Sequence, residues 1–262
     1  MPRIVAKADN LNELNANFAQ ERLFEPVFLN SVPKCGTHLV RNIMRMFVPV
    51  DQQYHQAFIQ HAILHRHQVA FSEAMPHLSW GHLLFSDDAA IVLRHVRHIV
   101  QIRDPYDWVL ARTRFFLSDT FQGALEHLKG GNVSIDEVIN MMIFGIHGKA
   151  PSLYEIFTHN AVSWLGTKVR VLRFEHLLHQ VRNIDSDEAE EFFRELLKDC
   201  GIREMPDDWR ERVRIGSDRQ QSGTARENLA GGVIDVPDQL NEMQKELVNY
   251  AAPGLRKVLG YE

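Results

Sequence analysis

Three short runs of apolar residues have the length and composition of buried β-strands. They occupy residues 26–32, 98–102 and 168–174 and read "PVFLNSV", "HIVQI" and "KVRVLRF". Continuous apolar runs of this length are typical of strands that are covered on both faces in a parallel sheet. Helical spacing of apolar residues follows or separates these runs over residues 37–47, 86–97, 105–117, 134–146 and 152–165. This alternation predicts an α/β fold in which a central parallel β-sheet is flanked by helices.

Two later segments have distinct local signals. Residues 183–201, "NIDSDEAEEFFRELLKDCG", predict a surface helix, because Ser186 or Asp185 can cap its start and Gly201 follows its end. Residues 216–239 are rich in glycine and polar side chains, which favours a mobile loop. A loop of this length within a compact domain is often functional.

Composition is that of a globular protein. The chain has 262 residues, of which 45% are hydrophobic, enough for one large domain or two small ones. Because the strands and helices alternate without a break, we expect one domain over residues 1–262, with residues 1–24 as an N-terminal extension. The sequence contains no repeat and no low-complexity tract.

Charge and cysteine content narrow the classes of partner and compartment. The formal charge of −5 argues against a broad nucleic-acid-binding surface, so any polyanionic partner is expected to be small. Two cysteines, Cys35 and Cys200, are too few for a disulfide framework and favour a reducing, cytoplasmic compartment. No apolar stretch approaches the ~20 residues of a membrane span.

The corner after the first predicted strand carries the first candidate chemistry. The stretch "SVPKCGTH" joins that strand to a helix through Lys34, Gly36 and Thr37. Backbone N–H groups and the positive end of a helix dipole meet at such a corner and attract a phosphate. Lys34 adds a mobile charge, Thr37 adds a hydroxyl, and Gly36 would let the backbone approach a ligand closely. The alternative is a plain turn, and the order of residues differs from the GxxxxGK[ST] pattern of nucleoside triphosphate sites.

A second strand-to-helix motif, at residues 98–116, carries further candidate binding residues. The stretch "HIVQIRDPYDWVLARTRFF" is another buried strand that ends at Arg103, with Pro105 well placed in the first turn of a helix. Together, "PKCGT" and "IRDPYDWVLA" resemble the two cofactor motifs of the PAPS-dependent sulfotransferases, where PAPS is 3′-phosphoadenosine-5′-phosphosulfate. The resemblance implies a P-loop-containing, nucleotide-binding fold. It also implies that residues 34–38, which are Lys34, Cys35, Gly36, Thr37 and His38, hold the 5′-phosphosulfate and that Arg103 holds the 3′-phosphate.

Further segments extend the resemblance from about residue 26 to the C-terminus. "LSWGHLLFSDDAAIVL" looks like the family segment with a histidine base, here His82, although His77 is a nearby competitor. "RQQSGTARENL" resembles the loop that covers the nucleotide, which implies a 3′-phosphate contact from Arg226. One departure is Ala111, where the family commonly has a serine for the 3′-phosphate. Charge from Arg112 or Arg226 is a possible substitute.

The resemblance implies sulfuryl transfer to a hydroxyl or phenol by in-line displacement. His82 would take the acceptor proton, and Lys34 with the loop N–H groups would stabilise the leaving phosphate, with no metal ion. A helical His61–His65 metal pair is conceivable but lacks a matching carboxylate cluster. Three alternatives stay open: a kinase with a nonstandard phosphate loop, a nucleotide-binding module without catalysis, and a Cys35 thiol nucleophile. The acceptor and the oligomeric state are not readable from the sequence.

Overall fold

A five-stranded parallel sheet forms the centre of the protein. The computed structural model describes residues 3–4, 7–123, 125–223, 225 and 235–261. The strand order is β3-β4-β2-β5-β7, and each neighbouring pair is parallel. The strands are β2 (Val27–Ser31), β3 (Ile59–Gln60), β4 (Leu78–His82), β5 (Arg97–Ile102) and β7 (Arg170–Arg173). The three predicted strands are therefore confirmed as β2, β5 and β7, and so is the α/β class. A separate antiparallel pair joins β1 (Arg3–Ile4) to β6 (Phe121–Gln122).

Helices connect and cover these strands. The α-helices are α1 (Leu11–Asn15), α2 (Thr37–Arg45), α3 (Asp87–Val92), α4 (Pro105–Leu117), α5 (Ile135–Phe144), α6 (Leu153–Asn160), α7 (Phe174–Arg182), α8 (Asp187–Asp199), α9 (Trp209–Ser217), α10 (Glu242–Ala251) and α11 (Leu255–Val258). Short 3₁₀ segments include η2 (His61–Arg66), η5 (Val162–Trp164) and η6 (Arg219–Gln221). Within the described ranges, no helix combines the length and the apolar character needed to cross a bilayer.

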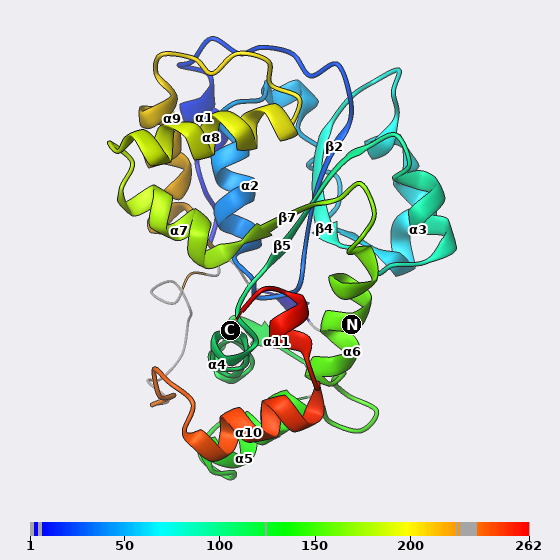
Figure 1. Ribbon diagram of the computed structural model, residues 1–262, viewed down its shortest axis with the longest axis vertical. Helices are drawn as coiled ribbons and strands as arrows, with labels where there is room; N and C mark the ends of the chain where they lie inside the picture. The colour runs from blue at the N-terminus through cyan, green and yellow to red at the C-terminus, as the bar shows by residue number, and fades with distance from the viewer. Residues whose placement is uncertain (1–2, 5–6, 124, 224, 226–234, 262) are drawn as a thin grey trace.

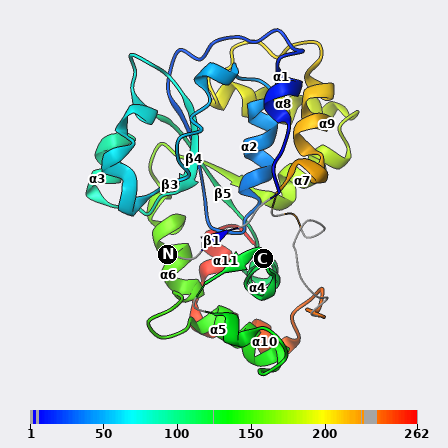
Figure 2. The same cartoon turned by 180° about the vertical axis from the view of Figure 1, so that it is seen from behind.

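The helices divide between two apolar cores, one on each side of the sheet. Helices α1, α2, α7, α8 and α9 gather on one side, at the upper left of Figure 1, and Figure 2 shows the same grouping from behind. Side chains of α2 and α8, such as Ile43 and Phe193, form that core with Leu29 of β2. The other core contains Phe28 of β2 and Trp108 of α4. Since β2 contributes fully buried residues to both cores, it lies at the centre of the fold.

The candidate chemistry lies at the carboxyl ends of the strands, which all face the same side of the parallel sheet. Strand β2 ends at Ser31, β4 at His82, and β5 at Ile102, immediately before Arg103. Strand order reverses here, because the chain runs from β2 to β3 and β4 on one side and then to β5 on the other. Ligands of open parallel sheets bind in the crevice outside the carboxyl ends of the strands at such a point.

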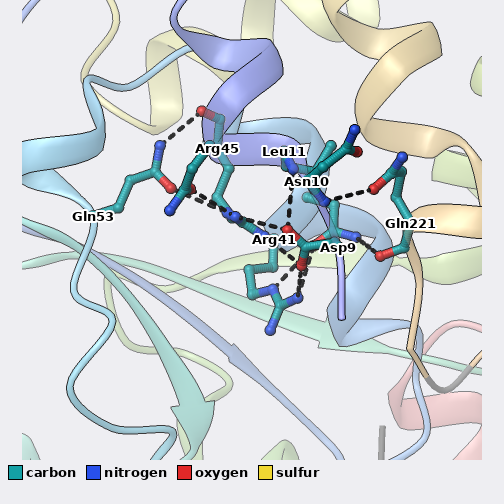
Figure 3. A network of polar contacts seen from close by, with 9 residues as sticks. Asp9, Asn10, Leu11, Arg41, Arg45, Gln53 and Gln221 are labelled. Atoms are coloured by element: carbon teal, nitrogen blue, oxygen red, sulfur yellow. Dashed lines mark hydrogen bonds and ion pairs between the residues drawn. The ribbon is translucent and has the colours of Figure 1, made fainter. Parts of the chain in front are cut away.

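The N-terminal segment is fastened to α2 by a polar network, shown in Figure 3. Arg45 is 4% exposed, and its two terminal guanidinium nitrogens form bidentate hydrogen bonds with the Asp9 carboxylate at 2.9 and 3.0 Å. Its Nε also donates to Gln53 at 3.0 Å, while Arg41 lies 3.6 Å from Asp9. The Asn10 backbone N–H donates to Oε1 of Gln221 in η6 at 3.2 Å, which links this segment to the turn after α9.

Replacing Asp9 by asparagine is expected to lower the free energy of unfolding by about 1.5–3 kcal/mol at pH 7, because it removes a charge-assisted contact from a buried guanidinium. Burial by itself would raise the pKa of Asp9, but the bonds and charge of Arg45, the Leu11 amide and Arg41 together lower it. A lowered folded-state pKa stabilises the protein above the unfolded value of ~3.9, and this stabilisation is lost as the pH falls through the folded value. The difference between wild type and variant in urea denaturation should therefore shrink below pH ~4. A difference that is independent of pH would contradict this role.

Candidate functional site

The loop between β2 and α2 is a strained turn that leaves the start of a helix uncapped. Lys34 has φ of +69°, the only positive φ of a non-glycine residue in the described part of the chain, and Gly36 follows with φ of +87°. Side chains cap the first turns of α3, α5 and α8, but α2 begins at Gly36 without such a bond. The Leu39 N–H donates to the Gly36 carbonyl oxygen at 2.8 Å, so the N–H groups of Thr37 and His38 are the ones that lack a side-chain cap, at the position where the sequence predicts an anion site.

Gly36 is required for a reason that differs from the one expected. The sequence suggested that glycine lets a ligand approach the backbone. The structure shows that a side chain at this position would collide with the ring of Phe174 and would lie 3.2 Å from Nε2 of Gln101. The left-handed backbone and the packing of Phe174 therefore both require glycine.

Substituting alanine for Gly36 is expected to lower the free energy of unfolding by about 2–5 kcal/mol, the sum of left-handed strain and overpacking. Gly254 is a matched control because its φ is +72° but nothing lies within 4 Å of an added Cβ. Gly254→Ala should cost only the backbone part, about 1–2 kcal/mol. Equal losses in chemical denaturation of the two variants would show that Phe174 does not restrict residue 36.

Lys34 has an environment suited to an anion-binding lysine. Its Nζ lies 3.8 Å from the centroid of the Phe115 ring of α4. Burial lowers the pKa of Lys34 to about 7, and the positive charge of Arg103 acts in the same direction. The neighbouring Cys35 thiol acts in the opposite direction, but its effect is smaller than that of burial or of Arg103. A bound anion would restore the missing negative charge and favour the ammonium form.

His82, at the end of β4, has a ring orientation fixed by its neighbours. Its Nδ1 lies 2.9 Å from the Ser31 carbonyl oxygen, which can only accept, so Nδ1 carries the proton. In the neutral ring this leaves Nε2 with the free lone pair. Burial lowers the pKa of His82 to about 4, against the opposing effect of the Ser31 hydrogen bond. The side chain is therefore a neutral imidazole at neutral pH, with Phe58 against its ring at 4.7 Å.

Ser31 is a candidate residue that the sequence analysis missed. Its hydroxyl lies 2.5 Å from Oγ1 of Thr37 and 3.1 Å from Nδ1 of His82. Ser31 therefore connects the first residue of α2 to the end of β4. The signal available in the sequence was a polar residue at the end of an apolar strand, and the structure shows that Ser31 is fully buried.

His38 and Cys35 occupy the same loop but differ in what they can do. Burial, with smaller contributions from Arg41, Lys34 and His82, holds the pKa of His38 well below its usual value. His38 Nδ1 is buried without a hydrogen-bond partner in the described part of the chain. Cys35 points into the apolar core, and burial raises the pKa of its thiol well above the usual value. The thiol-nucleophile alternative is wrong, because a buried, protonated thiol is inert.

Arg103 follows β5 and faces the same loop, since its charge acts on both Lys34 and Cys35. Its guanidinium lies over the Phe174 ring at 4.8 Å, and its Nε is buried without a partner among the described residues. Both amide atoms of Gln101, two positions earlier, are likewise buried and unpartnered within that range. Such groups carry a desolvation cost that a polar ligand could offset.

Two other arginines, Arg112 and Arg226, were considered for the 3′-phosphate. Arg226 lies outside the described residues. Arg112 is 2% exposed and donates to the carbonyl oxygens of Met142 at 3.0 Å and Pro151 at 2.8 Å. Arg112 therefore ties α4 to α5 and to the start of α6, and its hydrogen bonds are made there.

Metal chemistry has no evident site in the described ranges. No group of three His, Cys, Asp or Glu residues there could hold an ion. His61 and His65 lie on the 3₁₀ segment η2 and not on an α-helix. A 3₁₀ turn changes the side-chain spacing on which the proposed i, i+4 pair depended.

Comparisons with known proteins support the fold. No family model and no curated protein matches this sequence. Among solved structures, the crystal structure of the mouse sulfotransferase SULT7A1 complexed with PAP is similar, with a TM-score of 0.57. The match covers 96% of this chain and 93% of that chain at 12% sequence identity. The chain therefore has the α/β fold of a known sulfotransferase.

Proposed function

We propose that this protein is a sulfotransferase that moves a sulfuryl group from PAPS to a hydroxyl or phenol acceptor. The observation that carries the proposal is the meeting of Lys34, an uncapped helix start and the neutral His82 at one edge of the sheet. Ser31 links the loop side to the histidine side through hydrogen bonds at 2.5 and 3.1 Å. The fold similarity to a sulfotransferase complexed with PAP agrees with this arrangement.

The residues of the site fit an anionic nucleotide. Lys34 and Arg103 supply positive charge, and the first N–H groups of α2 supply donors. Within the described ranges, His38 Nδ1 and Arg103 Nε are buried without hydrogen-bond partners. A polar ligand at this position could form hydrogen bonds with both atoms. In this proposal Lys34, the backbone at Cys35 and Gly36, Thr37 and His38 hold the 5′-phosphosulfate. Arg103 holds the 3′-phosphate.

The protein groups divide the chemistry between them. When bound, PAPS supplies the sulfuryl group, and 3′,5′-adenosine bisphosphate departs with the electrons of the broken S–O bond. His82 Nε2 accepts the proton of the acceptor hydroxyl as its oxygen bonds to sulfur. Lys34 and the N–H groups of α2 stabilise the charge that develops on the leaving phosphate oxygen. Ser31 fixes the tautomer of His82 and so keeps the accepting nitrogen free.

The expected compartment follows from the cysteines. Cys35 and Cys200 are both buried and unpaired. This state fits the reducing, cytoplasmic environment in which we propose that the protein acts.

The proposal is tested by incubating the protein with PAPS labelled on sulfur and with separate panels of phenols, alcohols and sugars. We expect label on at least one hydroxyl class, with an equal amount of 3′,5′-adenosine bisphosphate released. Phosphorylation of an acceptor from ATP and magnesium, without transfer from PAPS, would instead support the kinase alternative.

A further inference from the structure

Helix α4 packs against three successive residues, Pro33, Lys34 and Cys35, of the loop between β2 and α2, which is called the phosphate loop below. The Trp108 indole Nε1–H donates to the Pro33 carbonyl oxygen at 2.6 Å. The Phe115 ring lies 3.8 Å from the Lys34 ammonium, and Cys35 is buried in the same apolar cluster as both aromatic rings. Trp108 and Phe115 are seven residues apart, so they lie on one face of α4.

These contacts act on the most strained part of the loop. A left-handed conformation costs a non-glycine residue roughly 1–2 kcal/mol, and Lys34 adopts it with φ of +69°. Strain of this kind persists only where surrounding contacts over-determine the backbone. Trp108 is fully buried and Phe115 is 7% exposed, so both rings are fixed by packing.

We propose that Trp108 and Phe115 are positioning residues that hold the phosphate loop and the Lys34 ammonium in the binding geometry before a nucleotide arrives. Trp108 fixes the backbone by its bond to Pro33, while Phe115 stabilises the charged form of Lys34 through its ring face. The proposal deepens the proposed function and rests on it for the identity of the ligand. Its physical content, a preorganised lysine, is independent of that identity.

The first experiment removes one N–H group. Trp108→Phe keeps a ring but deletes the bond to Pro33, and we expect binding of 3′,5′-adenosine bisphosphate to weaken about 3- to 10-fold. Trp164→Phe is the matched control, because Trp164 is 3% exposed and its Nε1 has no hydrogen-bond partner in the described part of the chain. It should leave the affinity within about twofold. Equal affinities of Trp108→Phe and wild type in calorimetry would overturn the role of Trp108.

The second experiment separates positioning from general stability by its pH dependence. The charged and titratable groups around Lys34 are Cys35 in the loop, Arg103 after β5, His38 on α2 and His82 on β4. Removing the ring in Phe115→Leu should leave bisphosphate affinity nearly unchanged at pH 6 and weaken it about 3- to 10-fold at pH 8. Phe115→Tyr, which keeps the ring face, should behave like wild type. If Phe115→Leu bound the bisphosphate more tightly than wild type at pH 6, the ring would be keeping the Lys34 ammonium away from the ligand, and the proposal would be overturned.

A third readout needs no nucleotide. The Lys34 signal in NMR spectra of the protein with ¹³C-labelled lysine, assigned with Lys34→Arg, should titrate near the pKa of about 7 and move to lower pH in Phe115→Leu. This shift without any bisphosphate binding would refute the sulfotransferase proposal and retain the positioning role. An unchanged titration in Phe115→Leu would refute the positioning role whatever the ligand.

Discussion

Replacing His82 by alanine is expected to lower kcat by about 10²- to 10⁴-fold, the usual contribution of a general base. Affinity for 3′,5′-adenosine bisphosphate should stay within about twofold of wild type, because the loop and Arg103 are unchanged. The reason lies in the ring geometry: Nδ1 is committed to Ser31 at 2.9 Å, and Nε2 is the nitrogen left to accept a proton. Steady-state rates and calorimetry on the same preparations provide the two measurements.

His77 provides the control for this prediction. His77 immediately precedes β4 and His82 ends that strand, so the two histidines lie at opposite ends of β4. His77 packs edge-on against Tyr54, with ring centroids 5.6 Å apart. His77→Ala should therefore retain turnover within a few-fold of wild type once correctly folded protein is compared. Full activity of His82→Ala would show that another group removes the acceptor proton.

Replacing Lys34 by methionine is expected to lower kcat/KM by about 10²- to 10³-fold, since it removes a donor aimed at developing charge. Methionine keeps the length and the apolar stem that packs beside Phe115. The free protein should also lose about tenfold or more in bisphosphate affinity, as is typical for a charge-assisted bond. A variant with near wild-type kcat/KM would exclude Lys34 from the reaction.

Lys34→Met also tests how kcat/KM depends on pH. In the free protein His82 must be neutral and Lys34 charged, and their pKa values are about 4 and about 7. The rate constant kcat/KM should therefore rise with pH to a plateau above ~5 and fall again above ~7. Lys34→Met should lose the alkaline limb and keep the acidic one. An alkaline limb that persists in Lys34→Met would assign that titration to another group.

Two of the three strands that the sequence predicted, β2 and β5, are buried along nearly their whole length, whereas the third, β7, lies at the edge of the sheet and has exposed residues at both ends. Strand β2 is fully buried along its length, and its apolar run is continuous except near its end. By contrast, β3 has two residues, and its existence depends on pairing with β4. The helix predicted over 152–165 ends at Asn160, because Ala161 leaves the helical conformation with φ of −134°. Such ends depend on tertiary contacts that a local pattern does not contain.

Candidate site residues were found where they belong to a motif and missed where they act through distant contacts. Lys34, His82 and Arg103 follow strands, so their grouping at one edge of a parallel sheet was predictable. Trp108 and Phe115 are 75 and 81 positions away from the residues they contact, and nothing local distinguishes them from core aromatics. The sequence pattern singled out Gly36, but its clash with Phe174 could be seen only in the fold.

The most direct test of the account is the calorimetric comparison of 3′,5′-adenosine bisphosphate with ATP and magnesium, on wild type, Lys34→Met and Arg103→Ala. The account predicts that wild type binds the bisphosphate in preference to ATP and that both variants lose this binding. Preference for ATP with magnesium, or no binding of either nucleotide, would contradict the sulfotransferase proposal.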